Sequence, residues 1–137
     1  MFEIQDINHV NMVVQNLDRA IRFYCEVLGM ENTARNPAFT SRGAWLRKNN
    51  AEIHLIHVDS ATHSPGDLSF TAATTTDKEI SNSRHFSLVI DDTESLVAQL
   101  QKHNIPIVYG PVNRPGGLVQ TYCYDPDGHL IEFSQFQ

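Results

Sequence analysis

The sequence predicts an α+β fold built from two modules, each with the order strand–helix–strand–strand–strand. An apolar stripe with helical spacing occurs twice, each time after one strand pattern and before three more. The two halves can also be aligned, because His85 lies 76 positions after His9 and Glu132 lies 78 positions after His54. The first offset places HFSLVI on HVNMVV, and the second places DGHLIEF on NNAEIHL. The chain therefore contains an internal repeat.

The first module is expected to occupy about residues 1–58. A strand should run from Ile7 to Val14, and Asn16 is a suitable N-cap for the helix that follows, with Asp18 in its first turn. Gly29 closes that helix. The apolar stripe of the helix comprises Ala20, Ile21, Phe23, Tyr24, Val27 and Leu28, and further strands are expected at Glu31–Arg35, Gly43–Arg47 and Glu52–Val58.

The second module is expected at about residues 83–137, after a linking loop at about 59–82. That loop is rich in Ser, Thr and Asp and lacks periodicity, and loops of this length are usually functional or mobile. Asp92 or Thr93 can cap the second helix, which should end near His103. The expected strands are Arg84–Ile90, Pro106–Tyr109, Val119–Tyr124 and His129–Gln135, and the helix carries Leu96, Val97 and Leu100. A chain of 137 residues is expected to form a single domain.

Composition excludes several classes of function. The net charge of -6 and the lack of a basic stripe argue against a nucleic-acid binder. No apolar run approaches the roughly 20 residues of a membrane helix. The N-terminal segment MFEIQDINHV has neither a basic nor an apolar signal region, so no secretion signal is expected. Cys25 and Cys123 lack metal-type spacing, which favours a reduced, cytoplasmic protein.

Four polar side chains occupy equivalent places in the repeat. His9 and His85 lie near the start of each module, and His54 and Glu132 lie in its last strand. Glu132 interrupts an apolar strand, where an unpaired carboxylate is costly to bury, so it needs partners. Imidazole and carboxylate are the usual ligands of Zn, Ni, Mn and Fe, and the sequence therefore predicts a divalent metal site formed by these four residues. Glu52 is an alternative to His54, because residues two apart on a strand face the same side.

Three other residues are candidates for substrate binding. Tyr122 can donate a hydrogen bond to a bound anion or can pack in the core. Arg114 lies in the expected loop NRPGG, where it can bind an anionic substrate or remain solvated. Trp45 can line a pocket or pack in the core. Cys123 should face away from Tyr122, so a catalytic thiol is not expected.

The segments HVNMVVQNLDRAIRFYCEVLGM and YCYDPDGHLIEF resemble the vicinal oxygen chelate superfamily, which includes glyoxalase I, bleomycin-resistance proteins and extradiol dioxygenases. GAWLRKNNAEIHLIHV is similar to a glyoxalase-I-like branch. The resemblance implies a cup-shaped split barrel around one metal, with His9, His85 and Glu132 as ligands. His54 stands at the fourth position, where glyoxalase I has glutamate. A homodimer whose chains complete each other's sites is also implied.

The resemblance further implies a metal-dependent isomerase or lyase of the glyoxalase type. Its small-molecule substrate would carry vicinal oxygens and react through an oxyanion or enediolate, with Glu132 or His54 moving the proton. One alternative is thiol or water addition to an epoxide, as in fosfomycin resistance. Tyr122 matches a substrate-contacting tyrosine of those enzymes, whereas NRPGG does not clearly match their potassium loop. An extradiol dioxygenase and a metal-free, drug-sequestering protein are further alternatives.

Overall fold

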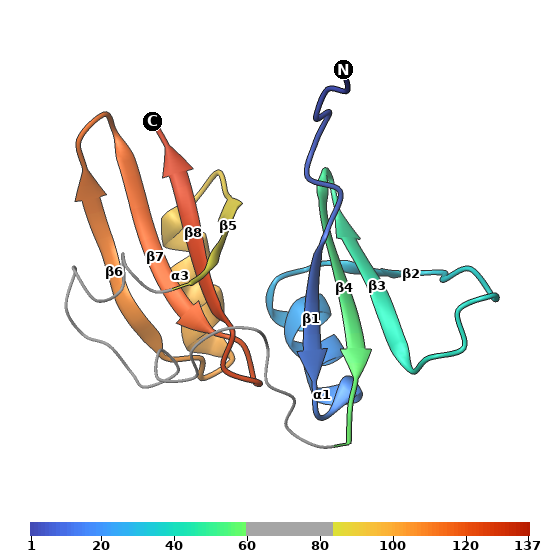
Figure 1. Cartoon of the computed structure of the whole chain (residues 1–137). Coiled ribbons are helices and arrows are strands. Elements are labelled where there is room, and N and C mark those ends of the chain that lie inside the picture. The colour runs from blue at the N-terminus through green and yellow to red at the C-terminus, as the bar shows by residue number, and fades with distance from the viewer. Residues whose placement is uncertain (60–83) are drawn as a thin grey trace. The chain divides into compact units, whose positions relative to one another are not determined.

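The computed structural model describes residues 1–59 and 84–137 (Figure 1). The chain divides into two compact units, Met1–Ser60 and Ala61–Gln137, and each contains one four-stranded sheet. The predicted α+β fold of two modules is thereby confirmed. The expected linking loop at about 59–82 falls outside the described residues apart from Asp59. The grouping of both modules into a single domain stays a prediction.

The first unit has a mixed sheet in the order β1-β4-β3-β2. β1 and β4 are parallel, and the other neighbours are antiparallel. A helical segment follows β1 and covers one face of the sheet (Figure 1). The elements are β1 (Val10–Val14), α1 (Leu17–Arg22), η1 (Phe23–Val27), β2 (Glu31–Thr33), β3 (Gly43–Lys48) and β4 (Ala51–His57).

The helical segment of the first unit begins as the sequence predicts. Asn16 is the N-cap, and its side-chain oxygen accepts a hydrogen bond from the backbone N–H of Arg19 at 2.9 Å. The last part of the segment, η1, widens into a π-helix, which the apolar spacing did not reveal. Gly29 follows with φ of 70°, a conformation that favours glycine. The core that the segment covers includes Val14, Ala20, Tyr24, Leu46 and Leu55.

The second unit repeats this arrangement in the order β5-β8-β7-β6. β5 and β8 are parallel, and β8–β7 and β7–β6 are antiparallel. Asp92 is the N-cap of α3, because its Oδ1 accepts from the backbone N–H groups of Glu94 and Ser95 at 3.0 and 3.2 Å. The elements are β5 (Phe86–Val89), α3 (Thr93–Lys102), β6 (Ile107–Arg114), β7 (Leu118–Tyr124) and β8 (Leu130–Phe136).

The strand register supports the predicted alignment of the repeat. In the first unit Asn11 of β1 pairs with His54 of β4, and in the second unit Ser87 of β5 pairs with Glu132 of β8. Asn11 and Ser87 are 76 positions apart, and His54 and Glu132 are 78 apart, which are the two predicted offsets. His54 and Glu132 thus occupy equivalent places, each next to an edge strand.

Most strand boundaries differ from the predicted ones by one or two residues, and two differ by more. β1 begins at Val10 and not at Ile7, whose backbone N–H donates to the Asp6 side chain at 2.7 Å instead of joining a strand ladder. β6 continues past Tyr109 to Arg114, and its register with β7 shifts between Ile107 and Tyr109 and again between Tyr109 and Val112. β6 is an edge strand, where a proline such as Pro111 is tolerated because no ladder partner needs its N–H. Arg114 therefore ends a strand and does not lie in a loop.

None of the helices in the described part of the chain is both long and apolar enough to cross a membrane.

Candidate functional site

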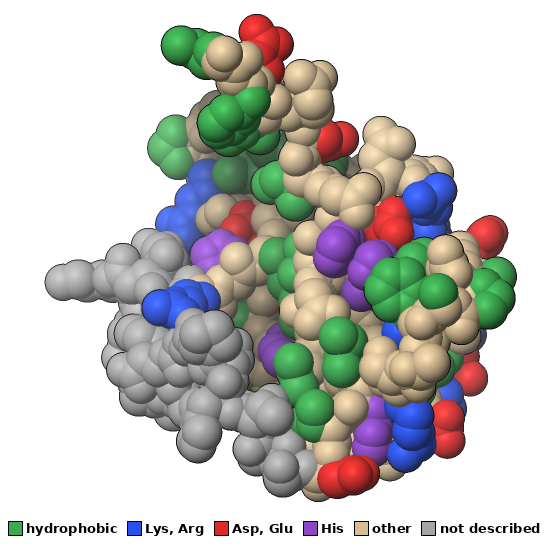
Figure 2. All heavy atoms as spheres, turned by 45° about the vertical axis from the view of Figure 1, so that its right-hand side comes forward, with side chains coloured by type: hydrophobic (Ala, Val, Ile, Leu, Met, Phe, Trp, Pro, Cys, Tyr) green, Lys and Arg blue, Asp and Glu red, His purple; other side chains and the backbone are tan. Residues whose placement is uncertain are grey.

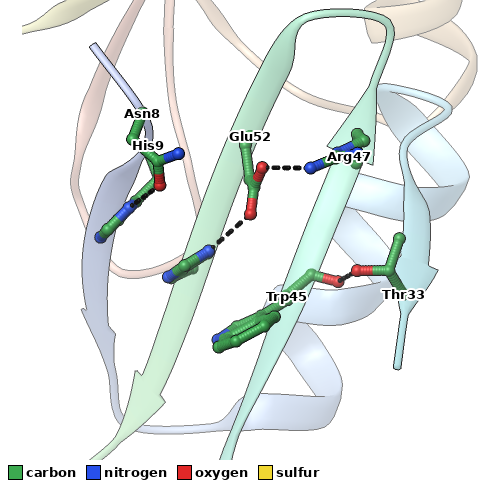
Figure 3. A network of polar contacts seen from close by, with 7 residues as sticks. Asn8, His9, Thr33, Trp45, Arg47 and Glu52 are labelled. Atoms are coloured by element: carbon green, nitrogen blue, oxygen red, sulfur yellow. Dashed lines mark hydrogen bonds and ion pairs between the residues drawn. The ribbon is translucent and has the colours of Figure 1, made fainter. Parts of the chain in front are cut away.

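In the first unit, three aromatic side chains stack on one face of the sheet. The imidazole rings of His9 and His54 are 3.9 Å apart between centroids with an interplanar angle of 13°, and the Trp45 ring stacks on His54 at 4.8 Å and 10°. Figure 3 shows the side chains of His9 and Trp45 on either side of the strand that carries Glu52. The face is opposite to the core, because Ala44 and Leu46 on either side of Trp45 are buried. Trp45 is half-buried and contacts a candidate ligand directly.

Glu52 shares this face and holds His54. Its Oε1 lies 2.9 Å from Nε2 of His54, and its Oε2 accepts from Nη2 of Arg47 at 2.7 Å (Figure 3). The hydrogen bond with His54, followed by that with Arg47, lowers the pKa of the Glu52 carboxyl. An ionised carboxylate only accepts hydrogen bonds, so Nε2 of His54 is the donor. His54 and Glu52 are thus adjacent, and either remains a candidate ligand.

In the second unit, Glu132 is buried among polar partners. Its Oε2 lies 2.8 Å from Nε2 of His85. Its Oε1 accepts from Nε2 of Gln120 at 2.7 Å and from the hydroxyl of Ser134 at 2.6 Å. Burial raises the pKa of the Glu132 carboxyl, but these hydrogen bonds and the nearby His85 outweigh it, so the pKa is lowered overall. The carboxylate in the apolar strand therefore has the partners that its burial requires.

Tyr122 lies beside this pair. Its side chain is buried, and its ring meets the His85 ring edge to face at 5.6 Å between centroids. Tyr109 packs against it with centroids 6.2 Å apart. Cys123 is buried, and burial followed by the charge of Asp125 raises the pKa of its thiol to about 12. A thiol with that pKa is not a nucleophile at neutral pH, in agreement with the expectation from the sequence.

Arg114, the predicted contact for an anionic substrate, has a described hydrogen bond inside the protein. Its Nε donates to Oε1 of Gln120 at 2.7 Å. Gln120, which sequence analysis did not single out, thus connects Arg114 with Glu132. The signal that could have identified Gln120 is its position two residues before Tyr122 in the same strand, because alternate residues of a strand share a face.

The structure brings the four predicted ligands together as two pairs, one in each unit. His9 and His54 form the first pair, and His85 and Glu132 form the second. Within the described part of each unit, no three His, Cys, Asp or Glu side chains form a group that could hold a metal ion. Histidine side chains reach the molecular surface beside hydrophobic ones (Figure 2), and His9 is among the exposed residues.

The chain is similar in sequence and in fold to several known proteins. The chain is 31% identical over 138 residues to lactoylglutathione lyase from Haemophilus influenzae, covering 93% of this chain and 90% of that protein. A crystal structure of a putative glyoxalase family protein from Bacillus anthracis has a TM-score of 0.76 and 22% identity, covering 100% and 99% of the two chains. A mutant of the fosfomycin resistance protein FosX from Listeria monocytogenes, solved with Mn(II) and a dihydroxypropylphosphonic acid, has a TM-score of 0.73 and 15% identity, covering 98% and 95%.

The family comparison covers almost the whole chain. The family model of the Glyoxalase/Bleomycin resistance protein/Dioxygenase superfamily matches residues 6–133. This range includes both four-stranded sheets except for the last residues of β8, together with all four predicted ligands. The chain therefore belongs to the Glyoxalase/Bleomycin resistance protein/Dioxygenase superfamily.

Proposed function

We propose that this protein is a divalent-metal-dependent enzyme of the glyoxalase type, an isomerase or lyase acting on a small substrate with vicinal oxygens. The proposal rests chiefly on the pair formed by His85 and Glu132. A buried carboxylate with a lowered pKa, beside an imidazole nitrogen, offers two adjacent ligand atoms of the kind that Zn, Ni, Mn and Fe prefer. The 31% identity to a lactoylglutathione lyase supports the reaction class.

The two atoms of this pair lie close enough for one ion to bind both. Nε2 of His85 and Oε2 of Glu132 are 2.8 Å apart, which is the distance of their ion pair. Two atoms that each lie about 2.1 Å from one ion are roughly 3.0 to 3.4 Å apart, so a small separation of the two side chains would admit the ion. His9 and His54 are the other proposed ligands, with Glu52 as the alternative to His54. A divalent ion held by these residues would supply positive charge that stabilises an oxyanion or enediolate developing on the substrate.

The chain's own residues would carry out the remaining steps. Glu132 or His54 is the proposed proton carrier, and the one that serves would leave the metal ion during turnover. Tyr122 is proposed to donate a hydrogen bond to a substrate oxygen, and Trp45 to pack against the substrate. Arg114 is the proposed contact for a negatively charged substrate group. A homodimer whose chains complete each other's sites and a cytoplasmic location also stay predictions.

A second candidate is thiol or water addition to an epoxide. The contact between Tyr122 and His85 favours it, because the sequence resemblance places a substrate-contacting tyrosine of fosfomycin-modifying enzymes at this position. The two candidates require different substrates and can be separated by assay. Adducts of α-ketoaldehydes with thiols test the first reaction, and a phosphonate epoxide supplied with a thiol or with water alone tests the second.

Metal content is the first measurement. The protein would be stripped with a chelator and offered Ni, Zn, Mn and Fe(II) separately, beside Glu132→Ala and the control Glu31→Ala, which removes an exposed strand glutamate. Trp45 is the single tryptophan, so its fluorescence reports events at the adjacent His54. We expect stoichiometric binding in the wild type and in Glu31→Ala, and much weaker binding in Glu132→Ala. Absence of binding in all three proteins would overturn the proposal and favour a metal-free binding protein.

A further inference from the structure

A chain of hydrogen bonds crosses the sheet of the second unit and ends at Glu132. Arg114 at the end of β6 donates through Nε to Oε1 of Gln120 at 2.7 Å. Gln120 in β7 donates through Nε2 to Oε1 of Glu132 in β8, also at 2.7 Å. The three side chains lie on neighbouring strands, so the sheet itself fixes their spacing. This chain, Arg114–Gln120–Glu132, is called the amide relay below.

The chemistry of its two ends fixes the direction of the amide relay. A guanidinium only donates hydrogen bonds, so the atom of Gln120 that faces Arg114 must be the oxygen. An ionised carboxylate only accepts, so the atom that faces Glu132 must be the amide nitrogen. Each of these two contacts determines which side-chain atom of Gln120 is the oxygen and which is the nitrogen, and the two contacts agree. If the side-chain amide of Gln120 rotated by 180°, its oxygen and nitrogen would exchange places and both hydrogen bonds would be lost.

Ser134 donates a second hydrogen bond to the same carboxylate oxygen, and Ser87 contacts Ser134. The Ser134 hydroxyl donates to Oε1 of Glu132 at 2.6 Å, so its single proton is used there. The Ser87 hydroxyl, 2.8 Å from that of Ser134, must then be the donor in their contact. Oε1 of Glu132 thus accepts two short hydrogen bonds, which is about the capacity of one carboxylate oxygen. Only Oε2 faces His85.

We propose that Gln120 is a positioning residue that limits Glu132 to one metal-facing oxygen, Oε2, and so favours ions that accept a single carboxylate oxygen. This inference rests on the proposed function. Ca²⁺ takes six to eight oxygen ligands and often binds a carboxylate through both oxygens. Zn²⁺ sites use about four ligands, with imidazole and single carboxylate oxygens among them. With Oε1 engaged by Gln120 and Ser134, the site should discriminate strongly against Ca²⁺.

The test measures the binding of Zn²⁺ and of Ca²⁺ alone, by calorimetry without substrate, to the wild type, to Glu132→Ala and to three further variants. Gln120→Leu removes the amide, and Arg114→Leu removes the group that orients it. Thr121→Val is the control, because Thr121 is the buried neighbour of Gln120 on the opposite face of β7. In both relay variants we expect Zn²⁺ affinity to fall about tenfold to a hundredfold, the usual effect of losing a partner of a metal ligand. Affinity for Ca²⁺ should stay the same or rise, and Thr121→Val should match the wild type.

The outcomes separate this inference from the proposed function. If wild type binds Zn²⁺ and Glu132→Ala does not, the metal site stands, and unchanged Zn²⁺ affinity in both relay variants would then refute the positioning role alone. An equal loss of Zn²⁺ and Ca²⁺ affinity would also refute it, because general damage to the sheet would weaken both ions. Thermal unfolding of the metal-free proteins shows which variants are folded. If Gln120→Leu does not fold, Arg114→Leu alone tests the positioning role. No Zn²⁺ binding in the wild type would overturn both proposals.

Discussion

At the scale of single residues, each unit pairs one carboxylate with one imidazole, and the surroundings give the two pairs different properties. Glu52 is braced by Arg47, whose side chain is 60% exposed, so water competes with that ion pair. Glu132 is buried and is held by neutral donors, Gln120 and Ser134, in addition to His85. Glu132 is therefore held more firmly than Glu52, because water does not compete for its hydrogen bonds, and it is the better metal ligand. Glu52 is better suited to orient His54 than to replace it.

This difference predicts unequal effects of removing His54 and Glu52. His54→Ala should abolish tight metal binding, because it removes a proposed ligand. Glu52→Ala should weaken binding only about tenfold, since it removes a hydrogen-bond partner of that ligand. The measurement is a Ni²⁺ titration followed by the fluorescence of Trp45 and by calorimetry, with Arg47→Ala as a control that leaves both residues in place. Tight binding by His54→Ala together with none by Glu52→Ala would show that Glu52 is the ligand.

At the scale of secondary-structure elements, the alignment of the two units is the part of the fold that the sequence predicted best. β4 and β8 carry His54 and Glu132, and His9 and His85 come immediately before β1 and β5. Side chains along a strand alternate between the two faces of the sheet. Once one residue of a strand is aligned with its equivalent in the other unit, the face of every other residue in that strand follows. The offset between His9 and His85, and that between His54 and Glu132, were therefore enough to predict which side chains would share a face.

Other elements depended on interactions that a linear pattern does not contain. The start of β1 is set by the competing side chain of Asp6, and the extension of β6 by its place at the edge of the sheet. The spacing of Gln120 shows that it shares a strand face with Tyr122, but the sequence does not reveal its partners on β6 and β8. Whether His54 or Glu52 binds metal also depends on contacts, namely those that Glu52 already makes with Arg47 and His54.

The cap of α3 predicts a specific loss of stability in acid. Hydrogen bonds from the side chain and backbone of Ser95, and from the backbone of Glu94, lower the pKa of Asp92. A lowered folded-state pKa stabilises the protein above the unfolded-state pKa of about 3.9, and this stabilisation disappears as the pH falls through the folded-state value. Asp92→Asn keeps a cap without the charge.

The melting temperature of Asp92→Asn should therefore be lower than that of the wild type at neutral pH. The difference should begin to close as the pH falls to about 3.9 and should vanish below the folded-state pKa. Asp91→Asn is the control, because Asp91 is an exposed neighbour outside the cap and its removal should leave the melting curves unchanged. A difference between wild type and Asp92→Asn that is constant with pH would rule out a role for the charge.

At the scale of the whole molecule, the division of the candidate ligands between two units limits what either unit can do alone. The first unit contributes two imidazoles and the second an imidazole and a carboxylate. Two ligands are too few for a tight transition-metal site, which usually has three or four from the protein. The proposed activity therefore needs the ligands of a first unit together with those of a second unit. The resemblance implies that they come from two chains of a homodimer.

A mixing experiment tests whether two chains form each site. His9→Ala and His85→Ala each remove one ligand, from different units, so neither homodimer should bind metal tightly. In a heterodimer with shared sites, one site carries both substitutions and the other carries none. Because random exchange makes half of the dimers mixed, about a quarter of all sites should recover tight binding. Light scattering should first show a dimer, and mixing His9→Ala with His54→Ala, which alter the same unit, should recover nothing. If each chain forms its own site, neither mixture will bind metal.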